Sequence, residues 1–310
     1  MSNQSRLQRL LAYLERDPAN RNLLSDAAEA AYAEGEVDHA CALLDQLSVG
    51  GDLSAGQRNL RALVALAQDR FADAAVDLTF LRASGHDRPE VRFNLAWTMM
   101  MEARFEAALA LLDADVLAVS PKARMLKIQA LHHLERYAEA LRTGAELAAR
   151  YPDDDLLMGA LATLAMDADE LELSQMYAAG AGDNAEGLSA RGLFALDRHD
   201  NQAALVLFER SLEQQPANPR SWVGKGLALL GNGQAGEAGE AMERGAALGE
   251  DHLGSWVAAG WAHFIAGDAV AARGAFDRVV AIDPTFAEGH GGLAVLDILA
   301  GKREAAERQA

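Results

Sequence analysis

The sequence has a single cysteine and no long apolar segment, and each shortage excludes a class of protein. Cys41 alone cannot build an intrachain disulfide framework, so the composition suits a reducing compartment. The longest apolar runs, such as LLMGALATLAM, are far shorter than the roughly 20 residues that a membrane-spanning helix needs. The opening residues, MSNQSRLQRLLAYLERD, contain no apolar core of a secretory signal. We therefore predict a soluble cytoplasmic protein without membrane insertion.

Basic residues are also scarce, since 28 Lys and Arg stand against 46 Asp and Glu, for a formal net charge of −18. Phosphate backbones and anionic lipid surfaces are bound by concentrated Lys and Arg, so this balance predicts no nucleic acid partner. Half of the residues are hydrophobic, which argues against wholesale disorder.

A chain of 310 residues would ordinarily predict about two domains, but residues of similar size recur here every 34 positions. The recurrence is clearest in three contiguous units, 185–218, 219–252 and 253–286, each of which reads as two helices joined by a polar turn. The recurring residues are Gly192, Gly226 and Gly260, then Ala204, Ala238 and Ala272, then Phe208, Met242 and Phe276. We infer an array of helix pairs.

The same frame continues upstream with units that start at residues 21, 55 and 89. Alanine occupies both the eighth and the twentieth position of these units, at Ala28, Ala62 and Ala96 and at Ala40, Ala74 and Ala108. The next unit, 121–154, needs a local shift of about two residues, and 155–184 is about four residues short. A helix at 5–17 and a partial unit from residue 287 flank the array.

This pattern resembles the tetratricopeptide repeat (TPR) family, whose 34-residue unit carries small residues at positions 8 and 20. The resemblance covers nearly the whole chain and implies an all-α fold, a right-handed superhelical solenoid of antiparallel helix pairs. Glycine at position 15, in Gly35, Gly233, Gly267 and Gly301, suits a left-handed residue that closes the first helix. We predict an N-terminal sub-array at 1–154, a divergent unit at 155–184 and a C-terminal sub-array at 185–310.

In this family the first helices line a concave groove, and positions 2, 5, 9, 12 and 13 of each unit face it. Trp222 and Trp256, at position 4, are interpreted as core, whereas Trp97 and Trp261, at position 9, are expected in the groove. The predicted groove residues are unusually apolar for such a surface: Phe93, Trp97, Met100, Met101, Met125, His132, Trp261, Phe264 and Ile265. An equally weighted alternative is that Trp97 and Trp261 mainly pack neighbouring first helices, and the Met99–Met101 run also suits core packing.

Several motifs with known chemistry are absent. The Lys and Asn clamp that some relatives use to hold a carboxylate has Ser25, Glu29 and Leu60 in its places. The adjacent pair His132–His133 suits a shared metal poorly, because neighbouring helix residues are about 100° apart. No Ser/His/Asp or Cys/His arrangement has a supporting context. We predict no catalytic residue, no metal and no cofactor.

The leading hypothesis is a non-enzymatic scaffold or adaptor that binds an apolar or amphipathic segment of a protein partner in the groove. A second hypothesis is the substrate-recognition region of a larger enzyme, such as a bacterial glycosyltransferase or sulfotransferase. It is motivated by the ending GKREAAERQA, which stops partway into a second helix. A third is self-assembly through the open ends of the array, and the sequence leaves the oligomeric state undetermined.

Overall fold

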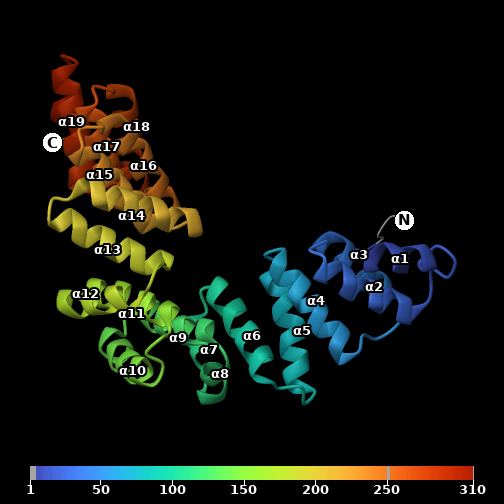
Figure 1. The fold of residues 1–310 in the computed structure, drawn as a ribbon. Coiled ribbons are helices and arrows are strands. Elements are labelled where there is room, and N and C mark those ends of the chain that lie inside the picture. Colours follow the sequence, from blue (N-terminus) through green and yellow to red (C-terminus); the bar gives the residue numbers. More distant parts are fainter. Residues whose placement is uncertain (1–4, 250–251, 310) are drawn as a thin grey trace. The chain divides into compact units, whose positions relative to one another are not determined.

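The computed structural model describes residues 5–249 and 252–309, and these residues form twenty helices and no strand (Figure 1). The helices follow one another in consecutive pairs, which confirms the all-α prediction. In chain order they are α1 (Arg6–Leu14), α2 (Arg21–Ala33), α3 (Val37–Val49), α4 (Ala55–Ala67), α5 (Phe71–Ala83), α6 (Pro89–Met101), α7 (Phe105–Leu109), α8 (Ala114–Val119), α9 (Pro121–His133), α10 (Tyr137–Arg150), α11 (Asp155–Asp167), α12 (Leu171–Gly180), α13 (Ala185–Asp197), α14 (Asn201–Gln214), α15 (Pro219–Gly231), α16 (Ala235–Leu248), α17 (Leu253–Ile265), α18 (Ala269–Ile282), α19 (Ala287–Leu299) and α20 (Arg303–Gln309).

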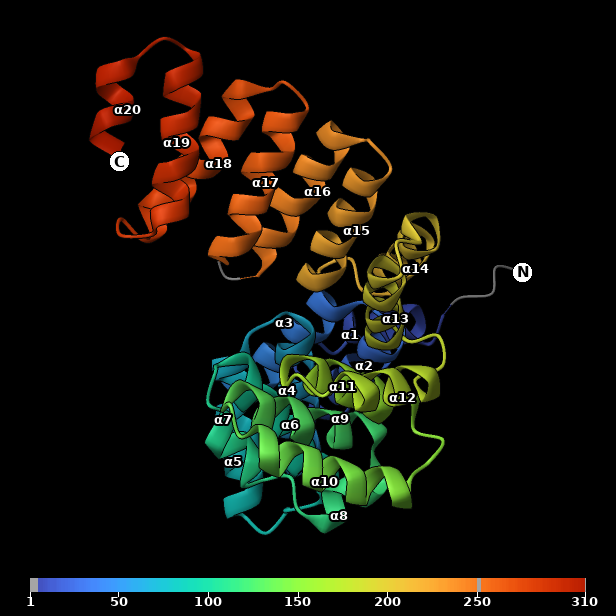
Figure 2. The same cartoon turned by 90° about the vertical axis from the view of Figure 1, so that its left-hand side faces the viewer.

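The chain divides into two compact units, a first unit of residues 1–140 and a second unit of residues 141–310. Helices α1 to α9 lie in the first unit and α11 to α20 in the second. In the second unit, α15 to α20 lie side by side in chain order (Figure 2). The domain boundaries at residues 154 and 184 stay a prediction.

Polar side chains fix where the first helix of most pairs begins. The residue just before the helix accepts a hydrogen bond from a backbone N–H of the first turn, which would otherwise lack a partner. The residues that do so are Asn20, Ser54, Asp154, Asn184, Asn218 and His252. Because such a residue recurs at the start of the units, the local sequence determines where the first helix of each of these pairs begins.

The end of each first helix is marked by one residue with a positive φ. The four glycines predicted to take this conformation do so, with φ between 71° and 82° at Gly35, Gly233, Gly267 and Gly301. Five non-glycine residues occupy the equivalent places with φ of 54–60°: Asp69, Ala103, Glu135, Asp169 and His199. The left-handed residues are 34 apart except at two steps, Ala103 to Glu135 and Asp169 to His199, which are 32 and 30 residues. The two short steps fall in the units 121–154 and 155–184, and the bounds of these units stay a prediction.

The second helix of unit 89–122 is broken, although the repeat pattern predicts one continuous helix there. Its residues form α7 and α8, and Asp113 begins α8 by accepting a hydrogen bond from the Val116 N–H at 3.1 Å. The break leaves backbone carbonyls without helical partners. Lys127 on α9 donates to the carbonyl of Leu112 inside the break at 3.1 Å, and Arg124 donates to the carbonyl of Leu117 near the end of α8 at 2.7 Å.

The small residues predicted at positions 8 and 20 lie in the core. Alanine pairs such as Ala28 and Ala40, or Ala62 and Ala74, have no exposed surface. The second unit also buries alanine at position 20, at Ala204, Ala238 and Ala272, but has glycine at position 8. Phe208 is fully buried between Gly192 and Gly224, and a Cβ on Gly192 would come within 2.8 Å of its ring. Glycine there lets α13 and α15 approach the aromatic ring from both sides.

The same arrangement recurs 68 residues later in the second unit. Phe276 is fully buried, and Cβ atoms on Gly260 and Gly292 would lie 2.6 and 2.5 Å from its ring. In each case the aromatic residue comes from a second helix, one glycine from its own pair and the other glycine from the following pair. The ring therefore joins successive helix pairs, which stabilises the array by contact between neighbours.

Candidate functional site

The groove residues predicted in the first unit lie on α6 and α9 and differ widely in burial. Phe93 and Trp97 are half-buried, Met100 is buried, and Met101 is 45% exposed. Met125, on α9, is half-buried. Only Met101 of this group thus presents a largely accessible apolar surface.

His132, also on α9, belongs to a group of aromatic rings. Its ring centroid lies 6.3 Å from that of His133 and 5.7 Å from that of Tyr137. The ring of His133 stacks on Phe105 at 4.6 Å with an interplanar angle of 3°. Both histidines are therefore engaged in ring contacts, and the described residues contain no group of three or more His, Cys, Asp or Glu placed to hold a metal ion.

Trp261, Phe264 and Ile265 lie on α17 in the second unit. The Trp261 ring meets Phe276 edge-on at 5.2 Å and Phe264 edge-on at 5.7 Å, so it covers the buried phenylalanine while remaining partly exposed. Ile265 is 63% exposed. Trp261 thus contributes to the core and to the surface at once, which combines the two interpretations that the sequence left open.

The two tryptophans interpreted as core are only half-buried. Trp222 and Trp256 both pack against the same core cluster on α15 to α18. The Trp222 indole N–H donates to the Pro216 carbonyl at 2.8 Å, and the Arg244 guanidinium lies 4.3 Å from its ring centroid. The polar edge of the ring therefore stays near solvent while its body is covered.

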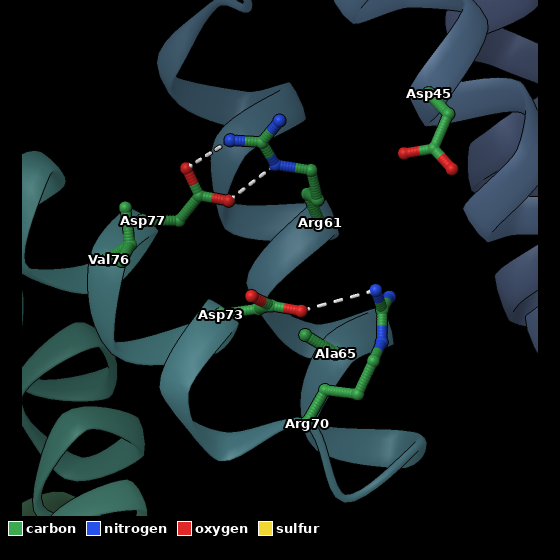
Figure 3. Close-up of a pocket in the computed structure, with 7 residues that line it drawn as sticks. All are labelled: Asp45, Arg61, Ala65, Arg70, Asp73, Val76 and Asp77. Atoms are coloured by element: carbon green, nitrogen blue, oxygen red, sulfur yellow. Dashed lines mark hydrogen bonds and ion pairs between the residues drawn. The ribbon is translucent and has the colours of Figure 1, made fainter.

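The first unit contains a charged pocket between α3, α4 and α5 (Figure 3). Its volume is about 260 Å³. Asp77 is only 2% exposed and receives two hydrogen bonds from Arg61, at 2.6 and 2.7 Å, and one from Arg58 at 3.2 Å. These bonds raise the pKa of the Arg61 guanidinium. At the rim, Arg70 pairs with Asp73 at 3.3 Å, so the charges are largely matched within the pocket.

Asp77 stands where other repeats place an apolar residue. The equivalent positions are occupied by Leu43 and Leu111, both buried. A buried carboxylate is costly unless it is paired and fully hydrogen-bonded, and Arg61 and Arg58 supply that pairing. The geometry favours a structural ion pair that joins α4 to α5 over a site for an external ligand.

The second unit contains a pocket of a different character, with a volume of about 490 Å³. Leu193 on α13 and Val223 and Leu227 on α15 provide its apolar lining, and Leu227 is 40% exposed. Gly224, Gly245 and Gly249 also line it, together with the residues Asp167, Pro219, Arg220, His252 and Ser255.

The polar groups of this pocket are engaged with one another. Arg220 donates to both carboxylate oxygens of Asp167, at 2.9 and 2.6 Å, and so links α15 to the end of α11. His252 Nδ1 lies 2.9 Å from the Ser255 hydroxyl. What remains accessible is chiefly aliphatic surface, which is suited to bind apolar groups rather than to perform acid–base chemistry.

Sequence reasoning on individual aromatic residues missed the centre of this pocket. Leu193 and Leu227 occupy position 9 of their units, as Trp261 does, but the prediction concentrated on Trp, Phe and Met. The 34-residue spacing of Leu193, Leu227 and Trp261 is the signal that could have identified them.

The helices are too short or too polar to cross a membrane anywhere in the described part of the chain. Two regions, residues 102–155 and 189–252, match the family model described as tetratricopeptide repeat. No curated protein matches the chain in sequence.

Solved structures resemble the chain in fold at low sequence identity. A chain in the crystal structure of the APC/C hetero-tetramer Cut9–Hcn1 is 13% identical, with a TM-score of 0.63 over 94% of this chain and 59% of that chain. Human IFIT1 in a dimer with PPP-AAAA is 14% identical, with a TM-score of 0.58 over 94% and 75%. PilW, a type IV pilus biogenesis factor, is 16% identical, with a TM-score of 0.51 over 61% and 90%. The chain thus spans about three fifths of the Cut9–Hcn1 chain it matches, and the likeness concerns the fold alone.

Proposed function

We propose that the chain is a non-catalytic binding module for a protein partner, because two of its regions match the tetratricopeptide repeat model and proteins of that family generally mediate protein–protein interaction. The partner would place an apolar or amphipathic segment against the first helices of the array. In the second unit the residues that would contact it are Leu193, Leu227, Trp261, Phe264 and Ile265, and Met101 is a separate candidate contact in the first unit.

The observation that carries this proposal is the apolar pocket of about 490 Å³ in the second unit. Leu193 and Leu227 line it from position 9 of consecutive first helices, and Leu227 remains 40% exposed. An accessible aliphatic surface that is concave and rimmed by polar residues is typical of a protein-binding site. Arg220 is paired with Asp167, and His252 Nδ1 accepts a hydrogen bond from the Ser255 N–H at the start of α17, so the polar groups of the pocket serve local structure, which supports a binding role.

We do not propose nucleic acid as the partner. That the chain binds no nucleic acid is a prediction from its composition. The acidic composition argues against it, whereas one structure of similar fold contains PPP-AAAA. The cytoplasmic location, the larger-enzyme hypothesis and the self-assembly hypothesis likewise stay predictions.

The test is site-specific photo-crosslinking in cells of the source organism. A photoreactive amino acid replaces Leu227 in one variant and Val206 in another. Val206, on α14, is 47% exposed and provides a control of similar accessibility outside the pocket. We expect a discrete protein adduct at position 227 that is lost when Leu193 is also changed to Glu. Equal adducts at both positions, or none at 227, would contradict the proposal.

Exposed aliphatic residues give a cleaner test of binding than the aromatic ring of Trp261. Trp261→Ala would remove the ring that covers Phe276, and loss of binding could then follow from loss of packing. Ile265→Ser and Met101→Ser change exposed side chains, at 63% and 45% exposure, and are expected to leave the helix content unchanged by circular dichroism. Weaker adduct formation in Ile265→Ser alone would place the partner on the second unit.

A further inference from the structure

Helix α12 of the second unit exposes three large apolar side chains. Leu171, Leu173 and Met176 are 54%, 36% and 56% exposed. Another side of the helix is fixed in the core, since Ser174 is fully buried and donates to a carbonyl of α11 at 2.8 Å, and Tyr177 is buried. Leu173 and Met176 are three residues apart, so they lie next to each other on the outer side of the helix.

This apolar pair is unusual among the second helices of the array. Leu173 and Met176 stand four and seven residues after Asp169, the residue with a positive φ. The same two places hold other kinds of residue in α5, α10 and α16: Asp73 and Val76, Glu139 and Arg142, and Glu237 and Glu240. Among the second helices that the structure describes, only α12 has a large apolar residue at both places, so the repeat pattern does not account for the pair.

Carboxylates without a cationic partner border the apolar pair. Asp169, Glu170 and Glu172 are exposed, and none of them forms an ion pair with a residue that the structure describes. They differ in this from Asp167 and Asp183, which are bound by arginines. We define the α12 face as the three apolar and three acidic residues together: Asp169, Glu170, Leu171, Glu172, Leu173 and Met176.

We infer that the α12 face binds a segment of a partner protein in which apolar side chains lie next to Lys or Arg. This goes beyond the proposed function, because α12 is a second helix and its residues do not line the pocket at Leu193 and Leu227. The second unit would then have two contact surfaces, one on its first helices and one on α12.

The apolar side chains favour a partner that covers them, because burial removes their surface from water. Met176 adds a flexible side chain that adapts to the shape of what it contacts. A lone Glu172 in the first turn would be explained by the helix dipole, but the dipole does not explain the exposed leucines and methionine beside it.

The charge of the α12 face decides which occupant fits. In a two-fold contact between copies of the chain, the same surface would meet itself, and its three carboxylates would repel those of the second copy. Anionic lipid and nucleic acid would be repelled for the same reason. A segment with Lys or Arg beside its apolar residues pairs with the carboxylates instead.

The first experiment observes Met176 directly in the full chain by NMR. The nine methionines are labelled with ¹³C at the methyl group, and Met176→Leu assigns the Met176 signal. The probe is a short peptide of leucine and lysine, and its controls replace lysine with glutamate or leucine with serine. We expect the probe to shift the Met176 signal at a concentration at least tenfold lower than either control. The difference between lysine and glutamate should shrink in about 1 M salt, where the Debye length falls to about 3 Å.

The methionine signals also report where the probe binds. Met101, 45% exposed on α6, is the internal comparison, and its signal should need at least tenfold more probe to shift. A Met176 signal that does not move with the probe, responds equally to the glutamate control, or shifts no earlier than that of Met101 would overturn the inference. A Met176 signal that depends on protein concentration without probe would also overturn it, because a second copy would then be the occupant.

Matched charge variants test the acidic border by fluorescence anisotropy of the labelled probe. Glu170→Gln/Glu172→Gln should weaken probe binding about fivefold, since each surface ion pair contributes modestly. Glu237→Gln/Glu240→Gln removes two exposed carboxylates of α16 that have no apolar pair beside them, and should weaken it less than twofold. Equal effects of the two double variants would count against the acidic border and overturn the inference.

A second matched set tests the apolar pair. Val206 on α14 occupies the place of Met176 in its own helix pair and is 47% exposed. Met176→Glu should weaken the probe at least tenfold and Val206→Glu less than twofold, with unchanged helix content by circular dichroism in both. Similar losses in the two variants would overturn the inference.

Photo-crosslinking in cells with the photoreactive amino acid at position 176 identifies the natural occupant and is independent of the adduct at position 227. A crosslinked peptide with apolar residues beside Lys or Arg supports the inference. An acidic peptide, a second copy of the chain, or no adduct at 176 overturns it. The proposed function is decided at position 227 alone, so the two failures are distinguishable.

Discussion

The two units have the same helical repeat but differ in the side chains that join their helices. The first unit joins α4 to α5 through a buried ion pair, Asp77 with Arg61, at a place where other repeats have leucine. The second unit joins its helix pairs through Phe208 and Phe276, each inserted between two glycines. The difference extends to the pockets. The charged pocket is largely satisfied internally, whereas the apolar pocket leaves aliphatic surface in contact with water, which a partner can cover.

The largest expected effect is in the second unit. Phe208→Ala would leave a cavity between Gly192 and Gly224 and cost about 3–5 kcal/mol of unfolding free energy. Urea unfolding followed by circular dichroism measures the loss, and hydrogen exchange shows whether it is confined to α13–α16. Phe80→Ala in the first unit, where the ring is 48% exposed, is the control and should cost about 1 kcal/mol or less. Equal losses of unfolding free energy in the two variants would contradict a greater contribution to stability from the glycine-flanked Phe208 ring.

The next effect concerns the ion pair of the first unit. Asp77→Ala leaves Arg61 and Arg58 without their shared carboxylate and should cost about 3 kcal/mol, the lower end for a broken buried pair, because Arg61 is partly exposed. The double variant Asp77→Leu/Arg61→Leu should recover much of that loss, since it restores the apolar residue found in other repeats. A double variant less stable than Asp77→Ala would contradict this account.

A smaller change tests the left-handed residues. Ala103 has a φ of 54°, whereas the equivalent residues Gly233, Gly267 and Gly301 of the second unit are glycine. Ala103→Gly should therefore raise the unfolding free energy by about 1 kcal/mol, and Gly267→Ala should lower it by a similar amount. The two urea midpoints should move in opposite directions. Destabilisation by both variants would mean that glycine's extra freedom in the unfolded chain dominates.

The smallest effect is a pH dependence in the second unit. Asp183 accepts hydrogen bonds from Arg191 at 3.1 Å and Arg210 at 2.6 Å, and these bonds lower the pKa of its carboxyl. A lowered folded-state pKa contributes stability above the unfolded-state pKa of about 3.9, and that contribution is lost as the pH falls through the folded-state value. Asp183→Asn should thus lower the melting temperature slightly at pH 7 and leave it unchanged near pH 2. A difference that persists in acid would assign the effect to packing.

Much of the fold followed from local patterns. The positions of Gly35, Gly233, Gly267 and Gly301 predicted the left-handed ends of first helices, and the alanines at positions 8 and 20 predicted the close contacts. The break between α7 and α8 was not predicted, because the Leu112 carbonyl inside it receives its hydrogen bond from Lys127 on the next helix, which no local pattern shows. The candidate site was predicted only in part. The prediction selected mainly aromatic and methionine side chains, and therefore omitted Leu193 and Leu227.

The sequence by itself determined the helical repeat and where its first helices end, because these depend on residues within one turn of helix or one unit of 34. Tertiary structure alone decided that Trp261 covers Phe276 while staying partly exposed, that Asp77 is neutralised by two arginines, and that Arg220 reaches Asp167. The physical reason is distance along the chain. Burial and charge pairing are set by neighbours from other helices, and their geometry is not encoded in any local period.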